Sequence, residues 1–388
     1  MFKNTAFKNT KTQQAAQSFT RRGLLKSFAA LVGTCAVSPL FSSPSVALSG
    51  ELEVFAWQNY FSKEMISEFK KDTGIQLSVT SFDTNAEALL YLKATKGQGF
   101  DLVFPTATSL TNWYVAEGFL QPLDEKRLVL DHIQPTIWEK SSNLNTIYRG
   151  QRFAMPFSWG AEGMCFDSTV HDYKAGQVSW ADQWLPENKG LVTARPHSAL
   201  TTMALMLDGT GERLNMAYVN EEIAREVFGE ALLFAIEHKS YIRQFWSDVE
   251  GLTSAFTQNN CVVGQAWDGV ALELWKSSKS KFKFVAPKEG ALAWLGTMAI
   301  PTEAQNVDQA YVLINWLSAP KGGGMFMSHS GFNSVVTEAK DRLDLASRDR
   351  FNFAFNDGAA MDNLNWWRPE PKWFQELREV YVRKYQAA

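Results

Sequence analysis

Five large aromatic residues stand where short apolar runs of this 388-residue sequence give way to turns: Trp57, Tyr60, Trp159, Trp267 and Trp294. Ring faces at such positions can pack against an aliphatic chain, or attract an ammonium group by about 0.5–2 kcal/mol per contact. Each ring taken alone fits a hydrophobic core at least as well. Because all five precede a turn, we predict that they line a ligand site.

The elements that position these rings can be followed from FAWQNYF (55–61) onward. Ser62 is a candidate helix N-cap, apolar residues recur at helical spacing from Met65 to Phe69, and Gly74 is a candidate C-cap. The next run, IQLSVTSF, has strand character, and strands and helices alternate through much of the chain. This order predicts an α/β fold with mixed, mostly parallel sheets, in which ligands bind beyond the carboxyl ends of the strands.

Charge and histidine spacing disfavour several classes of function. After residue 47 the chain has 32 Lys and Arg against 41 Asp and Glu, a formal charge of −9 that argues against nucleic acid as a partner. The five histidines show no HxxxH spacing and no CxxC is present, so we predict neither a metal site nor another cofactor. SHSGF (328–332) places Ser beside His without the G-x-S-x-G elbow, which leaves an exported enzyme as a weaker hypothesis.

Residues 1–47 predict export from the cytoplasm. They contain six Lys and Arg and no acidic residue, and TRRGLLK (20–26) is followed by a short apolar run and by SVA (45–47). This pattern is typical of a signal peptide cleaved near Ala47, and the paired arginines indicate the twin-arginine route. We therefore expect a soluble, periplasmic mature protein. Cys165 and Cys261 remain after cleavage, and the sequence leaves open whether they pair.

Six stretches in order carry a resemblance to a known family: VFAWQNYFSKEMISEFKKDTGIQLSV, FDLVFPT, FAMPFSWGAEGM, SWADQWLPENKG, VVGQAWDG and APKEGALAW. Together they resemble the periplasmic spermidine/putrescine-binding proteins, which capture substrate for ABC importers. No single stretch is decisive, but their order and spacing extend from about residue 51 to 335.

The resemblance implies a type II periplasmic-binding-protein fold with a cleft between two lobes. The expected division is an export signal (1–47), one lobe from residues 48–156 and 291–335, and another from residues 157–290 and 336–388. It also implies a monomer that binds a small amine and delivers it to a membrane permease and its ATPase. Trp57 and Tyr60 match the family's aromatic turn, Thr106 a hydroxyl residue of the cleft, and Trp267 an aromatic residue of the opposite lobe.

The departures from the family concern acids. Four positions where relatives often carry one hold other residues here: Asn59, Arg195, Val270 and Gly296. The remaining acids expected near the cleft are Asp268, Asp248 and Glu162, each equally compatible with a structural role. A polyamine needs carboxylate partners, whereas Arg195, if it faces the cleft, suits a ligand carboxylate or phosphate. Two ligand hypotheses therefore stand, a polyamine or a zwitterion bound through Arg195, and a receptor-docking sensor with the same fold is a third possibility.

Overall fold

The computed structural model describes residues 50–388, all within one compact unit. The strands are β1 (Gly50–Trp57), β2 (Ile75–Phe82), β3 (Leu102–Val103), β4 (Ile147–Tyr148), β5 (Gln151–Arg152), β6 (Met155–Asp167), β7 (Val192–Ala194), β8 (Ile242–Phe245), β9 (Val263–Trp267), β10 (Phe282–Val285), β11 (Leu292–Met298), β12 (Asn333–Ser334) and β13 (Asn365–Trp366). The export signal expected over residues 1–47 lies outside the described residues.

The α-helices are α1 (Lys63–Thr73), α2 (Asn85–Thr95), α3 (Ala107–Ser109), α4 (Pro135–Ser141), α5 (Pro196–Asp208), α6 (Glu212–Ala217), α7 (Glu221–Glu237), α8 (Val249–Thr257), α9 (Asp268–Ser277), α10 (Val307–Leu317), α11 (Pro320–Ser330), α12 (Leu345–Ala354) and α13 (Lys372–Ala387). Of the shorter helices, η1 (Leu110–Val115) directly continues α3.

Helix α1 begins and ends where its sequence predicts. The hydroxyl of Ser62 accepts a hydrogen bond of 3.0 Å from the backbone N–H of Met65. Gly74 adopts a left-handed conformation (φ 78°) that closes the helix, and its N–H donates to the carbonyl of Lys70. These caps orient α1 directly after the turn that carries Trp57 and Tyr60.

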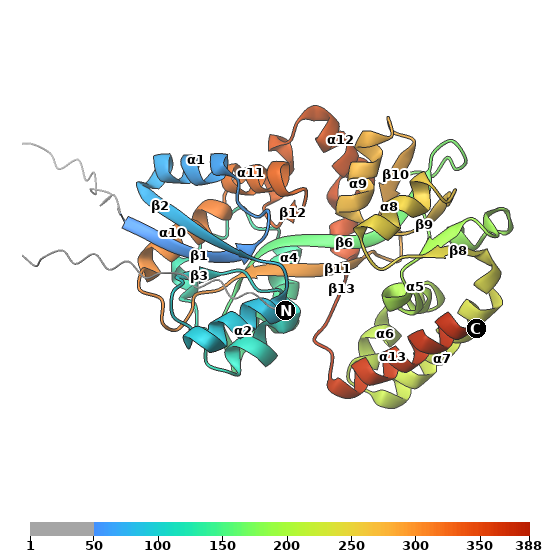
Figure 1. The fold of residues 1–388 in the computed structure, drawn as a ribbon, viewed down its shortest axis with the longest axis horizontal. Helices are drawn as coiled ribbons and strands as arrows, with labels where there is room; N and C mark the ends of the chain where they lie inside the picture. The colour runs from blue at the N-terminus through green and yellow to red at the C-terminus, as the bar shows by residue number, and fades with distance from the viewer. Residues whose placement is uncertain (1–49) are drawn as a thin grey trace, which may run out of the picture. The chain divides into compact units, whose positions relative to one another are not determined.

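Two sheets organise the described residues, and a small hairpin joins β4 to β5. The first has the order β2-β1-β3 with parallel pairing throughout. The second follows the order β13-β11-β6-β9-β7-β8, in which β6 has antiparallel neighbours while β9, β7 and β8 pair in parallel. Figure 1 shows β6 and β11 side by side through the middle of this unit, between the elements around β1 and those around β9.

The position of the aromatic rings relative to strand ends corrects one expectation. Trp57 and Trp267 are the last residues of β1 and β9, and Tyr60 lies in the turn after β1. Trp159 and Trp294 instead lie within β6 and β11, so these two do not precede a turn. The reason is that both strands continue through the middle of the unit instead of ending there.

Hydrophobic packing fixes the remaining elements. Apolar residues of α5, α7 and α13 form one buried cluster with β7 and β9.

Cys165 and Cys261 are both free and buried, which answers the question of their pairing. In the described part of the chain no helix is both long and apolar enough to cross a membrane.

Candidate functional site

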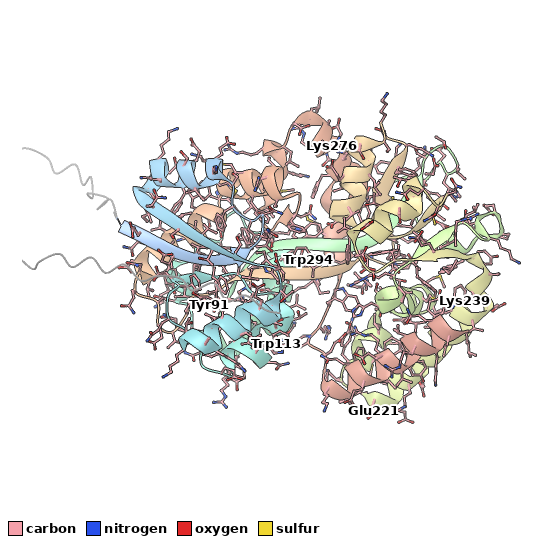
Figure 2. All side chains as sticks on the ribbon, viewed as in Figure 1. Tyr91, Trp113, Glu221, Lys239, Lys276 and Trp294 are labelled. Carbon is pink, nitrogen blue, oxygen red and sulfur yellow. The ribbon has the colours of Figure 1, made fainter. Side chains whose placement is uncertain are left out.

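A pocket with a volume of about 360 Å³ brings together residues from distant parts of the sequence. Its walls come from the start of α3 and from η1, from β11, from the start of α5, and from α13 with the segment that precedes it. The lining residues are Thr106, Thr108, Ser109, Asn112, Trp113, Arg195, His197, Trp294, Trp367, Arg368, Glu370, Gln375 and Arg378. Trp113 and Trp294, both labelled in Figure 2, come from different elements of this wall.

Thr106 is held in the pocket wall by the first residue of α2. The side-chain amide of Asn85 donates to Thr106 Oγ1 at 2.9 Å, and the backbone N–H of Thr106 donates to Asn85 Oδ1 at 3.2 Å. Thr106 also forms a bridge with Gly296 of β11. This double contact orients a hydroxyl-rich turn, with Thr108 and Ser109, toward the ligand space.

Trp294 depends on a glycine of the neighbouring strand. It pairs with Gly160 of β6, where a Cβ atom would lie 2.3 Å from the indole ring. The ring also makes an edge contact with Phe332 at 5.3 Å between centroids. The missing side chain at position 160 therefore leaves the space that the indole occupies beside the strand as it lines the pocket.

Arg195 lies at the N-cap of α5 and is already paired. Its Nη1 donates to Glu162 Oε2 at 3.1 Å, and its backbone N–H donates to Gln265 Oε1 at 3.1 Å. Its guanidinium also lies 4.8 Å from the ring centroid of Trp267. Glu162 is 2% exposed, and burial raises the pKa of its carboxyl group while Arg195 favours the ionised form. Arg195, which the sequence suggested as a binder of an anionic ligand group, is thus already paired with a buried carboxylate.

The C-terminal wall was missed by the sequence reasoning. Arg378 forms an ion pair with Glu370, and burial raises the pKa of that acid. The pKa of His197 lies below its usual value because of desolvation and the nearby charges of Arg378 and Arg195. The stretch WWRPEP (366–371) held a signal, since two indoles, a cation and an acid follow one another from the end of β13 to the start of α13.

The residues of the aromatic turn lie outside this pocket lining. Trp57 Nε1 donates to the carbonyl of Phe104 at 2.8 Å. Asn59 is exposed, with φ of 68°. Tyr60 is 3% exposed, its hydroxyl shares a hydrogen bond of 3.2 Å with Ser158 Oγ, and burial raises its pKa. In this conformation the ring of Tyr60 is part of the core.

The other predicted residues have structural contacts. Trp159 is fully buried and its Nε1 donates to the carbonyl of Ser334 at 3.0 Å, while Trp267 packs edge-on against Trp246. Asp248 is exposed and caps α8 through the N–H of Gly251.

Asp268 is buried between β6 and the segment after α11. Its carboxylate accepts hydrogen bonds from the N–H groups of Ala161 and Gly269 and from the amide of Asn333, at 2.8–3.0 Å. Burial nevertheless raises its pKa to about 7.

Three predicted site residues therefore meet in one pocket: Thr106, Arg195 and Trp294. The other seven do not line it, namely Trp57, Asn59, Tyr60, Trp159, Asp248, Trp267 and Asp268. Their part in ligand binding stays a prediction. What the pocket itself offers is indole faces, hydroxyl and amide groups, and several guanidinium groups.

Comparisons with known proteins give the fold and the family. The chain is 29% identical over 317 residues to spermidine/putrescine-binding periplasmic protein 1 of Haemophilus influenzae, covering 77% of this chain and 79% of that protein. It is 27% identical over 286 residues to the putrescine-binding periplasmic protein PotF of Escherichia coli, covering 69% of this chain and 73% of that protein.

Solved structures agree with the fold. The spermidine/putrescine ABC transporter substrate-binding protein PotD of Streptococcus pneumoniae aligns with a TM-score of 0.71 at 21% identity, over 87% of this chain and 99% of that one. The PotD lipoprotein of Treponema pallidum aligns with a TM-score of 0.62 at 16% identity, over 86% of this chain and 99% of that one. The predicted type II periplasmic-binding-protein fold is confirmed. The family model of bacterial extracellular solute-binding proteins matches residues 64–350, and the chain belongs to that family.

Proposed function

We propose that this protein captures a small amine-bearing solute in the pocket around Trp294 and delivers it to the permease and ATPase of an ABC importer. The observation that carries the proposal is the wall of three indoles: Trp113, Trp294 and Trp367 line one pocket of about 360 Å³. Indole faces attract ammonium groups and pack against methylene chains, and a volume of this size fits a small organic ligand.

Polyamines are the first candidates for the solute. The two relatives named above, at 27–29% identity, are named for binding putrescine or spermidine. Glu370 is the one carboxylate among the described pocket residues and could meet one ammonium group, although Arg378 already pairs with it. A zwitterionic solute is the second candidate, because Arg195, Arg368 and Arg378 line the same pocket.

The working cycle follows from the division expected from the sequence. We propose that residues 48–156 with 291–335 form one lobe and residues 157–290 with 336–388 the other, and that they close on the solute. Strands β6 and β11, which lie at the boundaries of these ranges, support a hinge at that place. The mature chain, cleaved near Ala47, acts as a periplasmic monomer and returns its solute chemically unchanged.

A thermal-shift screen of the exported protein tests the proposal. The panel contains putrescine, spermidine, cadaverine, γ-aminobutyrate and common amino acids. A ligand present at one hundred times its Kd adds about 2.7 kcal/mol of stability, which raises the melting temperature by several degrees. If no amine in the panel raises it, amine capture is wrong, and conversion of a bound compound would indicate an enzyme instead.

Two tryptophan variants connect the result to this pocket. Trp113 is 39% exposed, so Trp113→Leu should leave the fold intact while weakening solute binding several-fold. Trp316 on α10 does not line the pocket, so Trp316→Leu is the matched control and should bind the solute normally. Equal losses in both variants would place the binding site elsewhere.

A further inference from the structure

We infer that the solute carries an oxyanion, a carboxylate or a phosphonate, in addition to its amine, and that Arg368 binds this group. The inference rests on the proposed function of the same pocket and narrows its ligand class. It also moves the role of anion recognition from Arg195, which the sequence suggested, to a residue that the sequence reasoning did not single out.

The first argument is the balance of charges around the pocket. Its charged lining residues in the described chain are Arg195, Arg368, Arg378 and Glu370. Arg195 pairs with the buried Glu162 behind it, and Arg378 pairs with Glu370. The positive charge of Arg368 is left without a carboxylate partner among residues 50–388.

The second argument is that the guanidinium of Arg368 has no side-chain partner among residues 50–388. Within the described residues it makes neither an ion pair nor a side-chain hydrogen bond, although it is half-buried. A guanidinium presents a planar fork of N–H donors that fits a carboxylate or a phosphonate with two parallel hydrogen bonds. An unused fork in the wall of a ligand pocket is thus suited to the oxyanion of a solute.

The third argument is that the backbone holds Arg368 in place. The N–H of the preceding residue, Trp367, donates to the carbonyl of Ala293 in β11 at 2.8 Å. Pro369 and Pro371 follow closely and restrict the backbone before α13 begins. The cation is therefore presented from a fixed segment, with the indole of Trp367 beside it in the lining.

The same charge balance disfavours a solute that is only a cation. A diamine in this pocket would bring two positive charges beside an unmatched guanidinium, and like charges in a partly desolvated site repel each other. A solute with one ammonium and one oxyanion can place the first on the indole faces and the second on Arg368. The oxyanion then neutralises the charge of Arg368, and the indole faces stabilise the ammonium group.

A series of four short-chain solutes measures this directly by calorimetric titration of the exported protein. Putrescine carries two amines, γ-aminobutyrate one amine and one carboxylate, and succinate two carboxylates; 3-aminopropylphosphonate replaces the carboxylate by a phosphonate. We expect one of the two zwitterions to bind most tightly, and the stronger of them identifies the oxyanion. Tightest binding of putrescine would overturn the inference and leave the proposed function intact. Tightest binding of succinate would support the role of Arg368 and overturn the amine. Failure of all four to bind would overturn the inference, whereas the proposed function would fall only if the wider amine panel also gave no thermal shift.

Variants of Arg368 assign the effect to this residue. Arg368→Gln should weaken binding of the preferred zwitterion by about tenfold or more, because a hydrogen-bonded charge pair is lost. It should leave putrescine unaffected or bound more tightly, and Arg368→Lys should restore part of the zwitterion affinity. Arg348→Gln is the matched control, since Arg348 on α12 is also half-buried, has no ion pair in the described chain and lies outside the pocket. Unchanged zwitterion affinity in Arg368→Gln would overturn the inference.

Discussion

Two regions of this protein differ in whether their charged side chains are paired within the protein. Around β6 and β9, Glu162 and Asp268 are 2% and 3% exposed, and every one of their carboxylate oxygens has a hydrogen-bond donor. In the segment between β13 and α13, Arg368 is half-buried, and its guanidinium has no carboxylate partner and no side-chain hydrogen-bond acceptor among the described residues. A buried charge needs a partner within the folded protein, whereas a charge at a pocket surface remains hydrated and can pair with a ligand.

The largest expected effect comes from breaking the pair in the buried region. Arg195→Met removes the partner of Glu162 and should reduce the free energy of unfolding by about 3–5 kcal/mol, since an unpaired buried carboxylate is left behind. Urea denaturation followed by circular dichroism measures the change. In the double variant Glu162→Gln/Arg195→Met the loss should be smaller. A single variant as stable as the parent would mean that the pair contributes nothing to the fold.

Next in size is the contact that places Trp294 in the pocket. Gly160→Ala puts a methyl group where the indole lies, and the overpacking should cost about 1–3 kcal/mol and weaken solute binding. Gly229→Ala in α7 is the control, because beyond its own helix backbone and chain neighbours no atom of the described residues lies within 4 Å of the added Cβ, and alanine favours a helix. If Gly160→Ala keeps full stability and affinity, the indole is free to move and Gly160 does not position it.

How far the sequence predicts this molecule differs between these features. The caps of α1 depend on Ser62 and Gly74, which act within a few residues of their own positions, so the pattern predicts them correctly. The sequence pattern predicts that Trp159 and Trp294 lie at strand ends, but the continuation of β6 and β11 is decided by pairing between segments more than one hundred residues apart. Local periodicity does not contain that pairing.

The same reasoning applies to the candidate site. Thr106, Trp294 and Arg195 were predicted and do meet in the pocket. That Arg195 would be neutralised by Glu162 depends on the packing of α5 against β6, and the contribution of Arg368 depends on the course of the chain after β13. Neither contact follows from residue type or spacing, because both partners come from distant segments.

A pH-dependent effect also tests the buried region. Burial raises the pKa of Asp268 to about 7, whereas the unfolded chain releases this proton near pH 4. The folded state therefore binds more protons between these values, and the contribution of Asp268 to stability falls as pH rises from about 4 to 7, by at most about 1.4 kcal/mol per unit. Asp268→Asn cannot titrate and should lack this slope. Urea unfolding of both proteins at several pH values measures it, and parallel curves would show that Asp268 is ionised throughout.

The smallest expected effect belongs to the segment between β13 and α13 and completes the comparison. Arg368→Gln should change the free energy of unfolding by less than about 0.5 kcal/mol, because no ion pair or hydrogen bond of the described chain is lost. Urea denaturation without added solute measures this value beside that of Arg195→Met. A loss as large as that of Arg195→Met would mean that the fold requires Arg368, and its charge would then be structural. Solute affinity should show the opposite order: Arg368→Gln should weaken binding more than Arg195→Met does. The reason is that Arg368 contacts the ligand, whereas Arg195 of the parent protein is paired with Glu162.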